Sequence, residues 1–243
     1  MTNTRFEEYL SQVKDISNSD MDRREKIQNV TDCKEKLLKD QDMLMDLLEK
    51  SARMEEPEAF LPQDINGFSL YRDPDKDFSI HVFVWAPHVP YPIHDHGSWG
   101  IVGLYRGKIE ETKWQWLGED QGLVELERQQ PKSYTAGQVF HVLPLEEGPH
   151  SMRTLGDQTA ISIHTYGRPV RKSMLRLFHP SFDQKGKFSY YYAYPLYVYR
   201  RMLALNALGA VNEGAGEELE EELIRTSSNK VLLAALRQRE INN

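Results

Sequence analysis

The chain has a single cysteine, Cys33, among its 243 residues, and no apolar run approaches the roughly 20 residues that a membrane-spanning helix needs. The lone cysteine excludes an intrachain disulfide, which suits a reducing compartment. The N-terminal segment Met1–Glu8 lacks the apolar core of a signal peptide. Acidic residues outnumber basic ones by 37 to 30, giving a formal net charge of −7, whereas nucleic-acid-binding surfaces are usually basic. We therefore expect a soluble cytoplasmic protein that binds neither nucleic acid nor a membrane.

Proline and glycine, the strongest helix breakers, are missing from the start of the chain: the first proline is Pro57 and the first glycine is Gly67. Apolar residues in this opening segment recur at helical spacing, as in Phe6, Leu10 and Val13. The spacing predicts two or three amphipathic helices over residues 4–53. We expect them to cover one flank of a sheet.

From Gly67 onward, short runs of strand-forming residues separated by turn residues replace the helical pattern. Many short strands at close spacing are typical of an all-β barrel or jelly roll. The expected strands are Phe68–Tyr71, Phe78–Trp85, Tyr91–His94, Gly100–Tyr105, Lys108–Trp116, Leu123–Glu127, Gln138–Leu143 and Ala160–Tyr166.

After about Arg168 the pattern becomes irregular and then helical, with a helix expected between Pro195 and Gly209. One or two further helices are expected after the glycine-rich link at 212–216. The chain is therefore divided into an N-terminal helical flank (1–56), a barrel (57–170) and a C-terminal helical extension (171–243).

Two histidines, His94 and His96, alternate along one expected strand, so their side chains share a face. A third candidate, His150, lies far downstream, and His141 is its rival. A divalent metal held by neutral imidazoles needs side chains that converge from separate elements. The histidines therefore predict a three-histidine metal centre.

The chain resembles the cupin superfamily and, within it, the thiol dioxygenases, which include cysteine dioxygenase and 3-mercaptopropionate dioxygenase. The first cupin motif is present as His94-Asp95-His96 with Gly107, and the second as Gly137, Pro144, Gly148 and His150. The match runs from about Arg72 to Tyr166. The resemblance implies a mainly β fold, a double-stranded β-helix barrel, with α-helical flanks on both sides in sequence.

A glutamate that most cupins use as a metal ligand is missing here, because Gly100 and Ile101 stand at its place. The next acidic residues, Glu110 and Glu111, lie beyond a turn. The remaining set of His94, His96 and His150 is the one that thiol dioxygenases use for Fe(II). Animal cysteine dioxygenases also carry a cysteine in this region, cross-linked to a tyrosine, and this chain has none there. It therefore looks more like the bacterial mercaptopropionate branch.

The alternating residues Ser162, His164 and Tyr166 resemble the Ser-x-His-x-Tyr relay of these enzymes. A hydroxyl, an imidazole and a phenol in a row can orient the phenol and share a proton. The resemblance implies that Tyr166 orients bound substrate or oxygen. It also places a carboxylate-binding arginine at Arg72, with three alternatives downstream, Arg168, Arg171 and Arg176.

Other aromatic side chains are interpreted as structural. Trp85 and Trp99 are assigned to pocket or barrel packing, and three further histidines are expected to be structural or exposed: His81, His88 and His179.

The expected function is an iron-dependent oxidation of a small thiol carboxylate, of the cysteine or 3-mercaptopropionate type, to its sulfinic acid with O2. The partners are the thiol substrate and O2, and the oligomeric state stays open. Two alternatives remain. One is a three-histidine cupin oxygenase acting on a non-thiol substrate such as a diketone, and the other is a non-catalytic cupin module that binds a small molecule.

Overall fold

The computed structural model describes residues 4–40, 43, 47, 66–120, 123–171, 175–182, 188–195 and 213–242. Its helices are α1 (Thr4–Asn18), α2 (Arg23–Leu37), α5 (Glu213–Thr226) and α6 (Lys230–Asn242), with one short 3-10 helix, η1 (Leu145–Glu147). Its strands are β1 (Gly67–Arg72), β2 (Phe78–Trp85), β3 (Tyr91–His96), β4 (Gly100–Arg106), β5 (Lys108–Asp120), β6 (Leu123–Arg128), β7 (Lys132–Thr135), β8 (Val139–Val142), β9 (His150–Thr154), β10 (Ala160–Gly167), β11 (Leu175–Phe182) and β12 (Phe188–Pro195).

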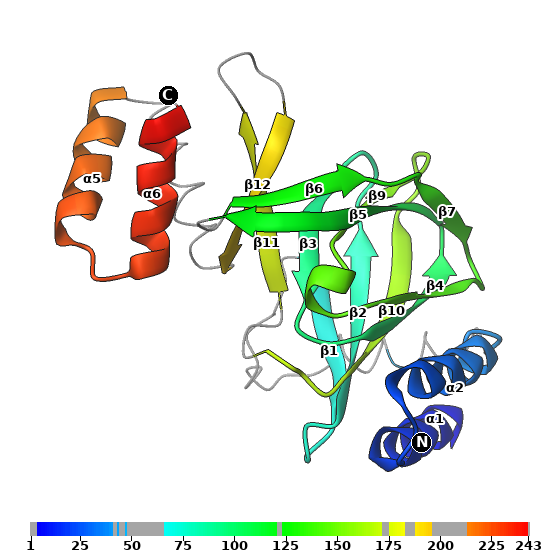
Figure 1. The fold of residues 1–243 in the computed structure, drawn as a ribbon. Helices are drawn as coiled ribbons and strands as arrows, with labels where there is room; N and C mark the ends of the chain where they lie inside the picture. The colour runs from blue at the N-terminus through cyan, green and yellow to red at the C-terminus, as the bar shows by residue number, and fades with distance from the viewer. Residues whose placement is uncertain are drawn as a thin grey trace.

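The strands form two sheets that close a barrel (Figure 1). One sheet has the order β1-β2-β10-β4-β8, and the other has the order β6-β12-β11-β3-β9-β5-β7. Their inner faces share one core, in which Phe83, Val102 and Phe140 of the first sheet meet Ile109 and Met152 of the second. The protein is therefore mainly β, with a barrel of the double-stranded β-helix type and flanking helices, as the sequence predicts.

Helices α1 and α2 cover the outer face of the five-stranded sheet (Figure 1). A capping box starts α2, in which the Asp22 carboxylate accepts from the backbone of Glu25 and the Glu25 carboxylate accepts from the backbone of Asp22. Apolar side chains of both helices pack against the outward residues of β2 and β10, such as Val82 and Ile163. The expected helical cover of one sheet flank is confirmed. A third helix near residues 44–48 would fall mostly outside the described residues.

Four strands were not expected from the sequence: β7, β9, β11 and β12. The prediction that the chain becomes irregular and then helical after Arg168 is wrong for β11 and β12, because β11 pairs with β3 and β12 pairs with β6. Both strands therefore belong to the barrel sheet. The helix expected from Pro195 to Gly209 lies outside the described residues, apart from Pro195, which ends β12. The division of the chain at residues 56 and 170 stays a prediction.

At the far side of the barrel, α5 and α6 pair with each other, and α6 contacts β12 (Figure 1). Two helices are present here, as expected, but α5 begins at Glu213, so residues 213–216 of the expected glycine-rich link are helical instead. No helix within the described ranges is long and apolar enough to cross a bilayer.

A fully buried lysine, Lys34, joins α2 to the relay strand β10. Its ammonium nitrogen donates to Thr165 Oγ1 at 2.7 Å, and the hydroxyl of Tyr9 lies 2.7 Å from the same oxygen. The helix comes this close because Gly103 has no side chain: a Cβ there would lie 3.0 Å from Lys34 Cγ and 2.9 Å from Leu38 Cδ1. Burial lowers the pKa of Lys34 well below its ordinary value.

The burial of Lys34 should make the stability of the protein depend on pH. Between the lowered pKa of Lys34 in the folded protein and its ordinary value in the unfolded chain, the unfolded state binds more protons. The free energy of unfolding should therefore rise with pH across that window. Lys34→Met keeps an apolar stem and removes the ionisable group, so it should raise Tm by a few degrees at about pH 7 and flatten this rise.

Thermal unfolding followed by circular dichroism between about pH 7 and about pH 10 measures both effects. Lys36→Met, at an exposed position of the same helix, serves as the control and should leave the pH dependence unchanged. A Lys34→Met protein that is less stable at neutral pH, with the original pH slope, would contradict the prediction.

Candidate metal centre

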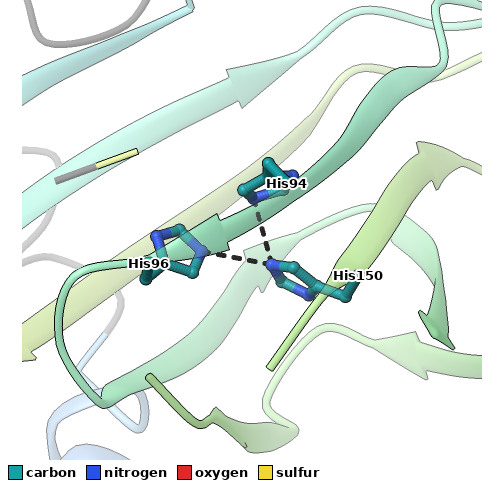
Figure 2. A group of neighbouring side chains, drawn as sticks. All are labelled: His94, His96 and His150. Atoms are coloured by element: carbon teal, nitrogen blue, oxygen red, sulfur yellow. Dashed lines mark hydrogen bonds between the residues drawn. The ribbon is translucent and has the colours of Figure 1, made fainter. Parts of the chain in front are cut away.

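Two adjacent strands bring three buried histidines together inside the barrel. His94 and His96 project from one face of β3, and His150 opens β9, where it pairs in register with His94. Figure 2 shows the three rings converging, with His150 Nε2 lying 3.0 Å from His94 Nε2 and 3.1 Å from His96 Nε2. The structure thus assembles the three predicted ligands from two separate elements.

The hydrogen bonds of the other ring nitrogens determine which nitrogens face the centre. His94 Nδ1 lies 2.9 Å from the carbonyl oxygen of Pro92, and His150 Nδ1 lies 2.9 Å from Glu111 Oε1. Both oxygens can only accept, so each Nδ1 carries the proton. Burial, reinforced by the neighbouring histidines, lowers the pKa of His94 and of His96, so these rings are neutral. An imidazole that holds its single proton on Nδ1 has a bare Nε2, so in this form His94 and His150 present Nε2 lone pairs to each other.

Two such lone pairs 3.0 Å apart need a shared proton or a cation between them. A divalent metal meets this need, because two nitrogens about 2.1 Å from one ion and roughly 90° apart are separated by about 3.0 Å. Among the described residues, the donor set is three imidazole nitrogens without a carboxylate, which suits Fe, Zn or Cu more than Mg or Ca. His94, His96 and His150 could therefore hold a transition metal and leave coordination positions open for substrate.

Glu111 holds the ring of His150 in place from the side away from the centre. Its side chain is 1% exposed, and it accepts from Tyr134 at 3.3 Å as well as from His150. Burial alone would raise the pKa of Glu111, but the bonds from His150 and Tyr134 lower it overall, so the carboxylate stays ionised. A carboxylate behind a ligand histidine fixes the ring and increases its basicity. Sequence reasoning considered Glu111 only as a direct ligand, although its alternation with Ile109 on the expected strand already placed it facing the core.

The rival ligands lie elsewhere. His141 is exposed on β8, and Glu110 pairs with Arg153 at the surface. Of the remaining histidines, His88 is exposed beside Asp157, as expected. The side chain of His179 lies outside the described residues.

Beside the centre, the relay residues form a continuous hydrogen-bonded row on the inner face of β10. Ser162 Oγ lies 2.8 Å from His164 Nε2, and His164 Nδ1 lies 2.8 Å from Tyr166 Oη. All three side chains are buried, and burial together with the charge of Lys34 lowers the pKa of His164, so its ring is neutral. The ring of Tyr166 lies 5.0 Å from that of His96, centroid to centroid. The relay therefore ends next to the three histidines.

The missing glutamate has a packing reason at Gly100. A Cβ at this position would lie 2.7 Å from the Tyr166 ring, so any side chain on Gly100 would displace the tyrosine. Gly100 and Tyr166 are register partners on neighbouring strands. The phenol ring of Tyr166 thus fills the space that a side chain at Gly100 would occupy.

Among the four candidate arginines, strand register assigns Arg72 to a row whose side chains face the inside of the barrel. Arg72 pairs in register with Ser79, and Ser79 pairs with Tyr166, so the three side chains form one row across β1, β2 and β10. A side chain in this row can approach a ligand bound near Tyr166.

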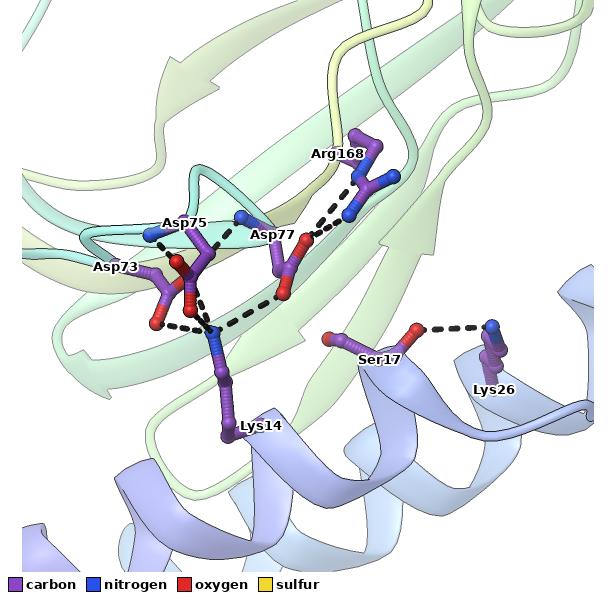
Figure 3. A network of polar contacts seen from close by, with 7 residues as sticks. All are labelled: Lys14, Ser17, Lys26, Asp73, Asp75, Asp77 and Arg168. Atoms are coloured by element: carbon purple, nitrogen blue, oxygen red, sulfur yellow. Dashed lines mark hydrogen bonds and ion pairs between the residues drawn. The ribbon is translucent and has the colours of Figure 1, made fainter.

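The three alternative arginines bind carboxylates instead. Arg168 bonds Asp77, in the network that also ties Lys14 of α1 to Asp73 and Asp75 (Figure 3). Arg171 and Arg176 both bond Asp95, which is fully buried between the two β3 histidines and points away from them.

His81 is buried rather than exposed, which agrees with the structural one of its two expected roles. It lies at 5% exposure on the inner face of β2, with its ring centroid 5.8 Å from that of Tyr166. Burial, together with the charge of Arg72, lowers the pKa of His81 to about 4. The period-two spacing of His81, Phe83 and Trp85 shows in the sequence that they share one face of β2. The sequence does not reveal which face of β2 turns inward.

No protein-family model matches the chain. Solved structures similar to it include the DMSP lyase DddQ from Ruegeria pomeroyi, with 18% identity, a TM-score of 0.33, and coverage of 46% of this chain and 50% of that one. The cupin domain of Schizosaccharomyces pombe Cnp3 matches with 15% identity, a TM-score of 0.34, and coverage of 48% and 69%. A Cupin 2 conserved barrel domain protein from Salinispora arenicola matches with 19% identity, a TM-score of 0.34, and coverage of 47% and 87%. The chain thus spans half the length of the lyase chain, and each similarity covers about half of this chain.

Proposed function

We propose that this protein is a non-haem iron dioxygenase that oxidises a small thiol carboxylate to its sulfinic acid. In this reaction a thiolate and O2 combine so that both oxygen atoms end on sulfur, giving R–SO2⁻ from R–S⁻. One observation carries the proposal: a three-histidine centre, which has no carboxylate ligand among the residues that the structure describes, lies directly beside a Ser-His-Tyr relay, with 5.0 Å between the ring centroids of His96 and Tyr166. A cupin that only stores a metal has no need of such a relay.

The residues around the centre have different roles in the proposed reaction. His94, His96 and His150 would hold Fe(II), which supplies the redox chemistry with O2 and, as a cation, favours the thiolate form of a bound thiol. Three neutral ligands leave that positive charge undiminished. Tyr166 would donate a hydrogen bond to the reacting group, and His164 and Ser162 hold its phenol in one orientation.

Arg72 is the proposed substrate-binding residue. A guanidinium pairs with both oxygens of a carboxylate through a planar fork, which orients as well as attracts it. The register that places Arg72 in the row of Tyr166 supports this role, as does the pairing of Arg168, Arg171 and Arg176 with aspartates. Cysteine and 3-mercaptopropionate both carry the required carboxylate, and both remain proposed substrates.

The proposal is tested by loading the protein with Fe(II) under anaerobic conditions and measuring oxygen uptake with a panel of thiols. We expect uptake with mercapto-acids and a sulfinate product that contains both atoms of 18O2. Uptake with a diketone and with no thiol would favour the non-thiol oxygenase. Iron binding without uptake for any substrate would favour a non-catalytic cupin.

Arg72→Ala should raise KM for a mercapto-acid by about 10–100-fold, because the lost charge-assisted hydrogen bonds hold substrate and transition state alike. Its kcat should change little, and a thiol that lacks a carboxylate should be affected far less. Steady-state oxygen uptake over a range of thiol concentrations measures both parameters. The control is Arg153→Ala, which removes a surface arginine paired with Glu110. Equal losses with both kinds of thiol would assign Arg72 a structural role instead.

A further inference from the structure

A tryptophan adds a fourth member to the relay. The indole nitrogen of Trp85, on β2, donates to Ser162 Oγ at 2.7 Å, and both side chains are buried. The hydrogen-bonded row therefore runs from Trp85 through Ser162 and His164 to Tyr166. Sequence reasoning assigned Trp85 to packing, and its hydrogen bond gives it a second role.

The chemistry of the indole fixes the direction of every bond in this row. An indole N–H can donate but cannot accept. Ser162 Oγ therefore accepts from Trp85, and its single hydroxyl proton needs another acceptor. Among the contacts of Ser162 in the described part of the chain, His164 Nε2 is the only group that can accept it.

His164 must then hold its own proton on the other nitrogen. A neutral imidazole carries one proton, so a bare Nε2 that accepts from Ser162 implies a protonated Nδ1. That Nδ1 proton is donated to Tyr166 Oη at 2.8 Å. Because the phenol oxygen accepts from His164, its own proton is directed away from His164.

We propose that Trp85 is a positioning residue that selects the Nδ1–H tautomer of His164 and so aims the phenol proton of Tyr166 toward the three-histidine centre. The consequence for turnover rests on the thiol oxidation proposed above. The tautomer itself follows from the hydrogen-bonded row alone.

Packing keeps the indole in the orientation that this role requires. The Trp85 ring stacks on Phe83, with 5.7 Å between centroids and 23° between planes, and on His164 at 6.2 Å and 29°. Its edge meets Tyr91 at 5.6 Å, and Tyr91 in turn meets the ring of His94 at 4.9 Å. Aromatic contacts on several sides therefore prevent the indole from turning its N–H away from Ser162.

The tautomer can be measured directly in metal-free protein labelled with 15N-histidine. Protonated and bare nitrogens of a neutral imidazole have well-separated 15N shifts, and long-range 1H–15N correlation spectra distinguish Nδ1 from Nε2. The His164 signals are assigned as those lost in His164→Gln. We expect the Nδ1–H tautomer in the wild-type protein and a mixture of tautomers in Trp85→Phe, which keeps an aromatic ring but loses the donor.

Two further variants sharpen the test. Trp114→Phe is the matched control, because Trp114 also donates its indole proton to a serine, Ser151, at 3.1 Å, away from the relay. It should leave the His164 shifts unchanged. Ser162→Ala removes the group through which Trp85 acts and should release the tautomer in the same way, so it decides the matter if Trp85→Phe does not fold.

An Nε2–H tautomer in the wild-type protein would overturn the proposal, as would an Nδ1–H tautomer that persists in both Trp85→Phe and Ser162→Ala. With Fe(II) bound and a thiol substrate, Trp85→Phe should lower kcat by about 10-fold and leave KM nearly unchanged. If no thiol is oxidised by the wild-type protein, the proposed function fails, while the tautomer measurement still decides the role of Trp85.

Discussion

Replacing His94 with alanine should abolish stoichiometric metal binding. Within the described part of the chain, three histidine nitrogens converge on the centre, and removal of His94 leaves two ligands in a buried space. We expect the affinity for Fe(II), or for Zn(II) or Co(II) as probes, to weaken by more than about 100-fold, beyond the usual effect of losing an outer partner. Metal content after dialysis and calorimetric titration measure this loss.

Glu111→Gln provides a graded comparison in the same experiment. It keeps a hydrogen-bond acceptor for His150 but removes the negative charge behind the ring, so affinity should fall by about 10–100-fold. His141→Ala is the control, since its exposed side chain lies outside the cluster. Retention of metal by His94→Ala, or its loss in His141→Ala, would refute the ligand assignment.

The sequence predicted the parts of this site that depend on local alternation. A period of two placed His94 and His96 on one face, and the same period aligned Ser162, His164 and Tyr166. These predictions needed only the identification of two strands. That His150 lies opposite His94 depends on strand pairing between distant segments, and no local spacing indicates it.

The features that the sequence did not reveal depend on which strands pair. His81 and Trp85 alternate with Val82 and Val84 along β2, and nothing local distinguishes the inner face from the outer one. The inner face is defined only once β2 pairs with β10 and α1 and α2 cover the other side. Strands β11 and β12 were missed for a related reason. Proline ends the second of them and was interpreted as a helix start, whereas pairing with β3 and β6 supplies the hydrogen bonds that make these segments strands.

Tyr166→Phe should lose turnover while it keeps the metal. The phenylalanine ring still fills the space over Gly100 and packs beside His96, so the three histidines should stay in place. The variant removes only the hydroxyl that is hydrogen-bonded to His164 and that is proposed to donate toward the centre. Loss of one positioned donor at a reacting group costs roughly 10–1000-fold in rate, and we expect a fall in kcat of this size. Oxygen uptake and iron content, measured on the same samples, separate the two properties.

Tyr9→Phe distinguishes the role of the phenol from its contribution to the fold. Tyr9 also places a buried hydroxyl against β10, 2.7 Å from Thr165 Oγ1, but on the opposite face of the strand. Its loss should lower stability by about 1 kcal/mol and leave kcat unchanged, because the outer face of β10 does not border the histidines. If Tyr166→Phe and Tyr9→Phe reduce turnover equally, the effect belongs to strand packing. Full turnover by Tyr166→Phe would remove the relay from the reaction, and with it the feature that separates a thiol dioxygenase from a metal-binding cupin.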